Sequence, residues 1–295
     1  EKLWAPWRYD GEDLWRAQCD AALVVLKEQE NAGIDIVSDG EMFRQHFVHG
    51  VLRRIDGIDF ERMTTMGIRA DRYKAEVPTV TTALRRPTSI HGREVAFTRS
   101  QTTRKLKFTM PGPMTIVDTI ADAHYGDRPA LAMAFAEILN AEALELEALG
   151  VDVIQFDEPA FNVYMQEVAT WGIEALERAA RGLKCKTAVH ICYGYGIQAN
   201  LDWKDTLGDE WAQYRETFPV WRTAPSIRSA WNAPIQRYRW NCWVCWRART
   251  SWSAPSTWPP TKWKHRSKSP RRSAPRWNMS RLNGFILAPI AAWCP

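Results

Sequence analysis

Two side chains near residue 190 have the types and the spacing that a metal ion needs. His190 and Cys192 are separated by a single residue, just after the apolar run Thr187-Ala188-Val189. On an extended strand, alternate side chains point to the same face, so the imidazole and the thiol can reach one ion. Both groups are good zinc ligands, and a catalytic zinc needs one or two more ligands plus an exchangeable position. The alternative, a buried histidine beside an ordinary core cysteine, stays open on spacing alone.

Carboxylates follow two other apolar runs. Glu41 closes the string Ser38-Asp39-Gly40-Glu41, and Asp157 and Glu158 follow the run of residues 151–156. Carboxylates at a strand end can hold a substrate ammonium group, act as acid and base, or cap a helix. Glu41, Asp157 and Glu158 are therefore candidate substrate-binding residues, and Glu41 and Asp157 are also candidate catalytic residues.

The segments around these side chains predict the elements that would position them. Short β-branched runs alternate with longer stretches of helical spacing, which is typical of βαβ units and a parallel sheet. The predicted strands are 34–37, 107–110, 151–156 and 187–189, and the predicted helices are 12–32, 131–149 and 163–181. Residues 61–105 are polar and β-rich, which indicates a long excursion or hairpin outside the barrel wall. In a (β/α) barrel the carboxyl ends of different strands converge on one face, so the polar side chains are expected to meet there.

Length and composition allow one large domain and exclude several classes of protein. An α/β barrel commonly occupies a chain of 295 residues. No apolar run reaches the roughly 18 residues of a membrane span, and the first residues lack the pattern of a signal peptide, so we expect a cytosolic protein. The six cysteines show no framework spacing, which favours thiols or metal ligands over disulfides.

The charge is divided unevenly along the chain. Residues 1–216 hold 25 of the 39 Lys and Arg and all 34 Asp and Glu, a net charge of −9, whereas the last 79 residues carry +14. Those 79 residues also hold ten of the sixteen tryptophans, far from ordinary domain usage. The composition therefore predicts that the last quarter differs in nature from the rest.

Four strings that occur in one order resemble the catalytic barrel of the cobalamin-independent methionine synthase family. They are Ser38-Asp39-Gly40-Glu41, Pro111-Gly112-Pro113-Met114-Thr115, Val153 to Ala160 and His190-Ile191-Cys192-Tyr193-Gly194. The resemblance covers roughly residues 1–220 and is closest to the short, single-barrel members. It implies an α/β protein with a TIM-type (β/α)8 barrel, which we expect to be incomplete at both ends, since the Gly-Ser-containing first strand of related barrels is not found here.

The resemblance also implies an activity and roles for individual residues. His190 and Cys192 match two zinc ligands, and Asp157 and Glu41 match carboxylates that hold homocysteine through its amino group. Coordination to Zn²⁺ deprotonates a thiol and leaves a sulfur that can attack a methyl group. The expected function is methyl transfer to homocysteine to form methionine, with methyltetrahydrofolate as the expected donor or a corrinoid in its place. A related zinc thiol-alkyl transferase with another thiol substrate, and an inactive fragment, are the alternatives.

Beyond residue 220 the chain departs from the family pattern. The family's remaining ligands, a glutamate in a Ser-Leu-Glu-Cys string and a cysteine in a Cys-Gly string, are missing. The pair Cys242 and Cys245 could suggest a metal or redox site, and the Arg/Trp mixture could suggest a nucleic-acid surface. Neither explains why acidic residues stop abruptly at Glu216, so we expect no nucleic-acid partner.

A frameshift explains both the missing ligands and the composition. Trp231 is encoded by TGG and the codon of Asn232 begins with AA, so reading from the third base of the tryptophan codon gives GAA, a glutamate. Suitable codons for 229–233 give Ser-Leu-Glu-Cys in that frame, and suitable codons for 287–292 give Cys-Thr-Asn-Cys-Gly in the same frame. We hypothesise that one or two bases were gained or lost near Val220, so that 1–220 is a partial zinc methyltransferase barrel and 221–295 an out-of-frame tail without a domain.

Overall fold

The computed structural model describes residues 7–192, 198–206 and 243–245 of the chain. By its contacts the chain divides into two compact units, residues 1–248 and 249–295, and all described residues belong to the first. The predicted domain boundary at residue 220 and the out-of-frame tail fall outside the described residues, apart from the backbone of 243–245. Both therefore stay predictions.

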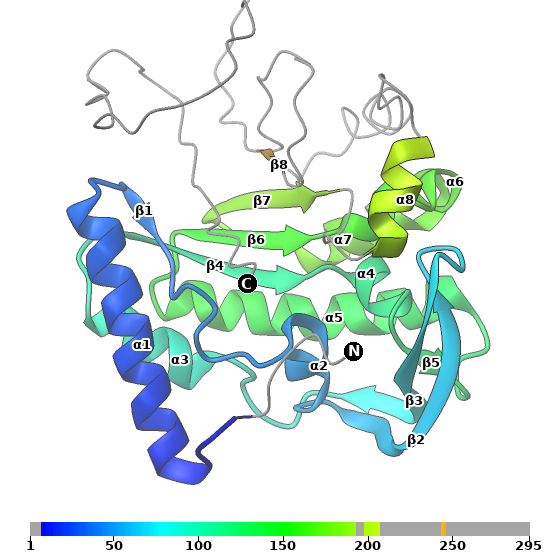
Figure 1. Ribbon diagram of the computed structural model, residues 1–295, viewed down its shortest axis with the longest axis horizontal. Coiled ribbons are helices and arrows are strands. Elements are labelled where there is room, and N and C mark those ends of the chain that lie inside the picture. Colours follow the sequence, from blue (N-terminus) through cyan, green and yellow to red (C-terminus); the bar gives the residue numbers. More distant parts are fainter. Residues whose placement is uncertain (1–6, 193–197, 207–242, 246–295) are drawn as a thin grey trace, which may run out of the picture. The chain divides into compact units, whose positions relative to one another are not determined.

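A sheet of five strands forms the centre of the first unit (Figure 1). Its order is β1 (Ile36–Val37), β4 (Lys105–Pro111), β6 (Val153–Asp157), β7 (Lys186–Ile191) and β8 (Trp243–Cys245). The first four are parallel neighbours in chain order, as in a (β/α) barrel, and β8 pairs antiparallel with β7. The four predicted strands and the α/β class are confirmed. Over the described residues the sheet is open, so the predicted barrel is present in part and is not closed.

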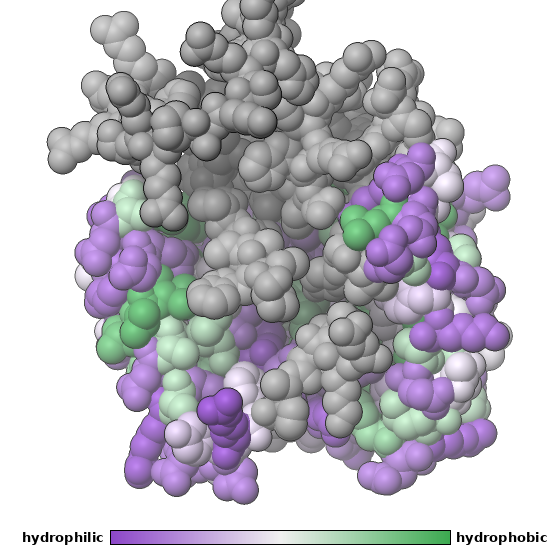
Figure 2. All heavy atoms as spheres, in the orientation of Figure 1, coloured by the Kyte–Doolittle hydropathy of each residue, from purple (hydrophilic) through white to green (hydrophobic). Residues whose placement is uncertain are grey.

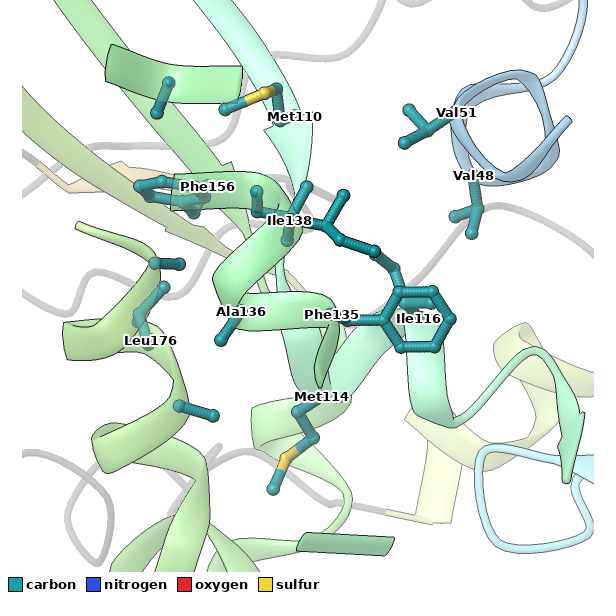
Figure 3. Close-up of a cluster of buried hydrophobic side chains, with 14 of the residues drawn as sticks. Val48, Val51, Met110, Met114, Ile116, Phe135, Ala136, Ile138, Phe156 and Leu176 are labelled. Atoms are coloured by element: carbon teal, nitrogen blue, oxygen red, sulfur yellow. The ribbon is translucent and has the colours of Figure 1, made fainter. Parts of the chain in front are cut away.

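Helices cover one face of this sheet. They include α1 (Gly11–Asn31), α2 (Phe47–Leu52), α5 (Arg128–Ala148) and α7 (Ile173–Ala179). Alternate side chains of the strands pack into a hydrophobic core with α2, α5 and α7. Figure 3 shows Met110 and Phe156 of this core near Ile138 of α5. The other alternate positions of β4, β6 and β7 carry Lys107, Gln155, Asp157 and His190 and lie outside that cluster. The sheet therefore has an apolar face against the helices and a polar face that corresponds to a barrel interior.

Helix α5 begins and ends close to where its sequence predicts. The Asp127 side chain accepts a hydrogen bond from the Ala130 amide at 2.9 Å, which caps the first turn of α5. Gly150, at φ +97°, follows its last turn in a conformation that favours glycine. The predicted helices 12–32 and 131–149 are thus confirmed as α1 and α5 within a few residues.

A long hairpin lies beside the main sheet (Figure 1). Strands β2 (Asp56–Ile68) and β3 (Tyr73–Arg85) pair antiparallel, and β3 pairs with β5 (Ala121–Asp122). The turn at the tip of the hairpin is attached to the segments that follow β4 and β6. The Tyr164 hydroxyl accepts a hydrogen bond from the Ala70 amide at 2.9 Å and donates one to Asp118 at 2.5 Å. The predicted hairpin outside the sheet is confirmed for residues 61–85 of the predicted range 61–105.

Two helical segments differ from the prediction. Residues 61–105 include a helix, α3 (Gly92–Ser100), which the sequence did not indicate because its buried positions include Gly92, Glu94 and Thr98 and give no apolar period. The predicted helix 163–181 is divided into α6 (Met165–Glu167), a π-helical segment (Val168–Gly172) and α7. Gly172, the last residue of the π-helical segment, lies close to α4 (Pro113–Val117), since a Cβ there would lie 2.7 Å from Cε of Met114. A 3-10 turn (Pro159–Asn162) and α8 (Gln198–Thr206) complete the described elements.

The described surface mixes hydrophilic and hydrophobic side chains, as Figure 2 shows for one face. Among the described helices, none combines the length and the apolar composition that crossing a membrane requires. The expected cytosolic location and the expected lack of a nucleic-acid partner stay predictions.

Candidate functional site

The end of β7 carries the two predicted metal ligands. His190 lies in the strand with its side chain 8% exposed, and Cys192 follows one residue after the strand and is half-buried. The Asn162 side-chain amide donates a hydrogen bond to the Cys192 carbonyl at 3.0 Å, and the Glu158 amide donates one to the His190 carbonyl at 2.7 Å. These bonds attach the end of β7 to the loop that follows β6.

His190 contacts the first predicted carboxylate. Asp157 is the last residue of β6 and pairs with His190 in the register of β6 and β7. Nδ1 of His190 lies 3.1 Å from Oδ2 of Asp157. This contact is an ion-pair distance and not a hydrogen bond. It places an imidazole beside a carboxylate at the carboxyl ends of β6 and β7.

Glu41 approaches the same site from the loop after β1. Its backbone is left-handed at φ +61°, and its amide donates a hydrogen bond to Oδ1 of Asp39 at 3.0 Å. A left-handed conformation is costly for a residue with a side chain and is common at functional sites. The Glu41 side chain reaches solvent, yet the surrounding protein desolvates it and raises the pKa of its carboxyl group; Arg44 and Lys107 oppose this shift and Asp157 and Asp39 add to it.

A buried ion pair supports the Glu41 loop. Arg44 and Asp39 are each 3% exposed, and their closest charged atoms are 3.9 Å apart. The guanidinium group of Arg44 also lies over the ring of Phe108 on β4, 4.7 Å from its centroid. The loop is thereby attached to the neighbouring strand, which restricts where the Glu41 carboxylate can point.

Glu158 has a different environment from its neighbour Asp157. Its side chain is completely buried and accepts hydrogen bonds from the amides of Met114 (3.0 Å) and Thr115 (2.8 Å) and from the Thr115 hydroxyl (2.7 Å). Burial raises the pKa of Glu158 to about 8, although these three hydrogen bonds lower it. These contacts favour the alternative in which Glu158 caps a helix. The helix that it caps is α4, and not the helical segment that follows β6. Its predicted contact with substrate stays a prediction.

Gly112 makes this arrangement possible. It is the N-cap of α4, and a Cβ there would lie 2.3 Å from Cδ of Glu158. Only glycine therefore leaves room for the carboxylate beneath the first turn of the helix, which explains the central residue of the Pro111-Gly112-Pro113 string.

Two polar residues that the sequence analysis did not single out lie on the same face. Gln155 is completely buried and donates a hydrogen bond to Oδ1 of Asp157 at 2.7 Å, and the Lys107 ammonium donates one to Oε1 of Gln155 at 3.1 Å. The sequence held a signal for them, since Lys107 and Gln155 are polar residues in otherwise apolar strands. In the structure each lies an even number of positions before the last residue of its strand, Pro111 or Asp157.

The described residues fit part of a metal centre. His190 and Cys192 supply an imidazole and a thiol, and Asp157 supplies the carboxylate that often orients a metal-binding histidine. Within the described ranges there is no group of three or more His, Cys, Asp or Glu side chains arranged to hold a metal. A complete metal centre therefore requires further ligands in addition to His190 and Cys192.

Comparison with known proteins adds a family to this geometry. Residues 9–201 match the model of the cobalamin-independent synthase catalytic domain. Methionine synthases from Saccharolobus islandicus and Sulfolobus acidocaldarius are 35% and 33% identical over 184 residues, which is 62% of this chain and 54% and 53% of theirs. The chain thus spans about half the length of the curated relatives it matches.

Solved structures show a similar fold. A B12-independent methionine synthase from Shewanella sp. W3-18-1, in complex with selenomethionine, superposes with a TM-score of 0.74 at 55% identity and covers 77% of this chain and 66% of that chain. A protein from Listeria monocytogenes described as a vitamin-B12 independent methionine synthase is 15% identical with a TM-score of 0.52, which supports the fold alone.

Proposed function

Because this chain belongs to the family of cobalamin-independent synthase catalytic domains, we propose that it carries the partial barrel of a zinc-dependent methyltransferase that forms methionine from homocysteine. One observation carries the proposal. Glu41, Asp157, His190 and Cys192 stand at or just after the carboxyl ends of β1, β6 and β7, and Asp157 interacts with both Glu41 and His190. The carboxyl ends of the strands are where barrels of this kind hold their substrates.

The carboxylates suit the amino group of an amino acid. Asp157 and Glu41 place two carboxylates near each other, and the negative charge of Asp157 adds to the cost of ionising Glu41. An ammonium group between them removes that cost, because a positive charge stabilises both ionised forms. The similarity to a protein described in complex with selenomethionine supports an amino acid with a thioether or thiol side chain as the ligand.

His190 and Cys192 are the residues that would hold zinc. Zinc supplies positive charge that keeps the homocysteine sulfur ionised near neutral pH while leaving it nucleophilic. The Asp157 carboxylate lies 3.1 Å from Nδ1 of the His190 imidazole, and both proposed ligands stand at the carboxyl end of β7. In the overall reaction the thiol loses its proton, a carbon–sulfur bond forms, and the donor keeps the electron pair of the bond it loses. Methyltetrahydrofolate is the expected donor, and a corrinoid is the alternative.

The missing zinc ligands belong to the same proposal. We infer that the reading frame changes near residue 220 and that residues 221–295 do not form the remaining strands of the barrel. A zinc site with only His190 and Cys192 would bind weakly, so the 295-residue chain would be impaired or inactive.

Zinc content and methyl transfer of two chains test this proposal. The 295-residue chain is compared with a chain whose frame is restored after codon 220. We expect about one zinc per repaired chain and methyl transfer from methyltetrahydrofolate to homocysteine, and neither in the unrepaired chain. Sequencing the gene across codon 220 tests the frame itself, and a confirmed, unbroken frame contradicts the frameshift.

A matched pair of cysteine variants makes the test specific. Cys192→Ser removes the proposed ligand, whereas Cys185→Ser changes a half-buried cysteine just before the other end of β7. In the repaired chain only Cys192→Ser should lose zinc. Zinc that stays with Cys192→Ser contradicts the proposal, and a repaired chain that methylates a different thiol supports the alternative transferase.

A further inference from the structure

The tip of the β2–β3 hairpin stands at the carboxyl ends of the central strands, the side of the sheet that carries the candidate site (Figure 1). Its turn contacts three segments, each of which follows one of those strands. Asp118 follows β4 and α4, Tyr164 follows β6, and Trp203 lies in α8 after β7. The tip therefore lies on the side from which ligands enter a sheet of this kind.

The tip holds one carboxylate of the chain itself. Arg69, Ala70 and Asp71 are left-handed, with φ of +55°, +56° and +61°, and such residues need support from their surroundings. The Arg69 amide donates to both oxygens of Asp118 at 3.3 Å, and the Arg69 guanidinium group pairs with the same carboxylate. The Ala70 amide donates to the Tyr164 hydroxyl. Asp118 is 1% exposed, so its carboxylate is part of the fold.

Arg72 adds a second guanidinium group to the tip. Its side chain is half-buried, and the carbon of its guanidinium group lies 3.2 Å from the centroid of the Trp203 ring. Within the described ranges, Asp118 forms its ion pair with Arg69, and Arg72 forms no ion pair. The tip thus brings two cations together beside one buried carboxylate.

The charge of Arg72 is only partly balanced in this environment. Burial and the positive charge of Arg69 lower the pKa of Arg72 to about 10, although Asp118 opposes the shift. Arg72 therefore remains charged near neutral pH, but its charge is costly there. A negative group beside Arg72 would reduce that cost, because an opposite charge stabilises the ionised form.

The stacking on Trp203 leaves the donors of Arg72 suited to such a group. The N–H groups of a guanidinium group lie in its plane, whereas the contact with the indole ring uses its face. Two parallel N–H groups fit two oxygens of a carboxylate or a phosphate. We propose that Arg72, stacked on Trp203 and next to Arg69, binds an oxyanion, a carboxylate or phosphate group of a small molecule. This inference concerns the tip alone and does not depend on the proposed function.

NMR titration of the 295-residue chain with inorganic phosphate tests the site. The indole N–H signal of Trp203 is identified by its loss in Trp203→Phe. In the wild type it should shift and saturate as phosphate replaces chloride at constant ionic strength. Arg72→Met should weaken phosphate binding at least about tenfold, since it removes hydrogen bonds between charged groups. Arg72→Lys, which keeps the charge but loses the paired donors, should bind with intermediate affinity.

Competition identifies the source of the oxyanion. Methyltetrahydrofolate carries carboxylate groups, so an oxyanion that belongs to this donor predicts that methyltetrahydrofolate displaces phosphate from the wild type and does so less well from Arg72→Met. If phosphate binds at Arg72 and methyltetrahydrofolate does not displace it, the site takes a free anion, and the inference holds in that form.

Two controls separate the loss of binding from a change in the tip. Lys74→Met removes an exposed lysine two residues away on the same hairpin and should leave the phosphate affinity unchanged. Amide exchange at Ala70, whose amide donates to Tyr164 at 2.9 Å, reports the tip in every variant. Should Arg72→Met speed up that exchange, Arg72→Lys carries the test.

The inference is overturned if phosphate and methyltetrahydrofolate both leave the Trp203 signal of the wild type unchanged. It is also overturned if Arg72→Met with an intact tip binds phosphate as the wild type does, or if Lys74→Met weakens binding as much as Arg72→Met. The stack of Arg72 on Trp203 would then only join the hairpin to α8.

Discussion

Gly112→Ala should destabilise the fold through a single contact. The new Cβ would lie 2.3 Å from both Cδ and Oε1 of Glu158, more than 1 Å inside ordinary van der Waals contact at 3.4 Å. Glu158 is completely buried and its two oxygens accept three hydrogen bonds from Met114 and Thr115, so it cannot move aside without breaking at least one. Gly112 has an ordinary φ of −83°, so backbone strain does not contribute.

The expected loss combines two effects. Overpacking a buried site costs about 1–3 kcal/mol, and leaving a buried polar group without its partner costs about 1–3 kcal/mol. The sum, about 2–6 kcal/mol, is a large part of the roughly 5–15 kcal/mol that stabilises a typical domain. Urea denaturation followed by circular dichroism measures it as a lower midpoint with an unchanged slope.

Two comparisons make this prediction specific. Gly50→Ala, at a position in α2 where a Cβ meets nothing within 4 Å, should be neutral or slightly stabilising. In a Glu158→Ala background the Gly112→Ala change should cost little, because the atoms it collides with are gone, and the double-mutant cycle should then show a large coupling energy. A Gly112→Ala protein within about 0.5 kcal/mol of wild type, or an additive cycle, refutes the reasoning.

Three further changes have defined outcomes. Burial lowers the pKa of His46 to about 4. The free energy of unfolding should therefore decrease as the pH is lowered from about 6.5 to 4, because the unfolded chain binds the proton at a higher pH than the folded chain does. His46→Asn, which does not titrate, should flatten that slope in urea titrations at each pH. Tyr164→Phe removes the hydroxyl that joins Ala70 to Asp118, and amide exchange at Ala70 should speed up while the core amides keep their protection. Burial and a nearby carboxylate raise the pKa of Cys185 to about 12, so alkylation followed by mass spectrometry should leave this thiol unmodified at pH 8, and rapid modification would contradict its burial.

The sequence predicted which strand ends form the site, but it did not predict the contacts between the side chains there. The four strands were visible because each is a short apolar run, and the polar residues Glu41, Asp157 and His190 stand where those runs stop. The rule that parallel strands present their carboxyl ends on one side then brought these residues together. Their mutual distances required the register of the strands, which no single stretch of sequence contains.

What the sequence missed has physical reasons. Helix α3 buries Gly92, Glu94 and Thr98, so its buried side has no apolar period. The cap at Glu158 joins residues 43 and 44 positions apart in the chain, and an adjacent pair of acidic residues gives no sign that one is buried and the other faces the site. Tertiary contacts decided both.

Zinc bound to the frame-restored chain is the most direct test of the central claim, that His190 and Cys192 at the end of β7 form half of a zinc site. We predict about one zinc per restored chain, retained in Cys185→Ser and lost in both Cys192→Ser and His190→Gln while circular dichroism shows that the variants remain folded. Stoichiometric zinc in either of those last two variants, or none in the restored chain, would contradict the account.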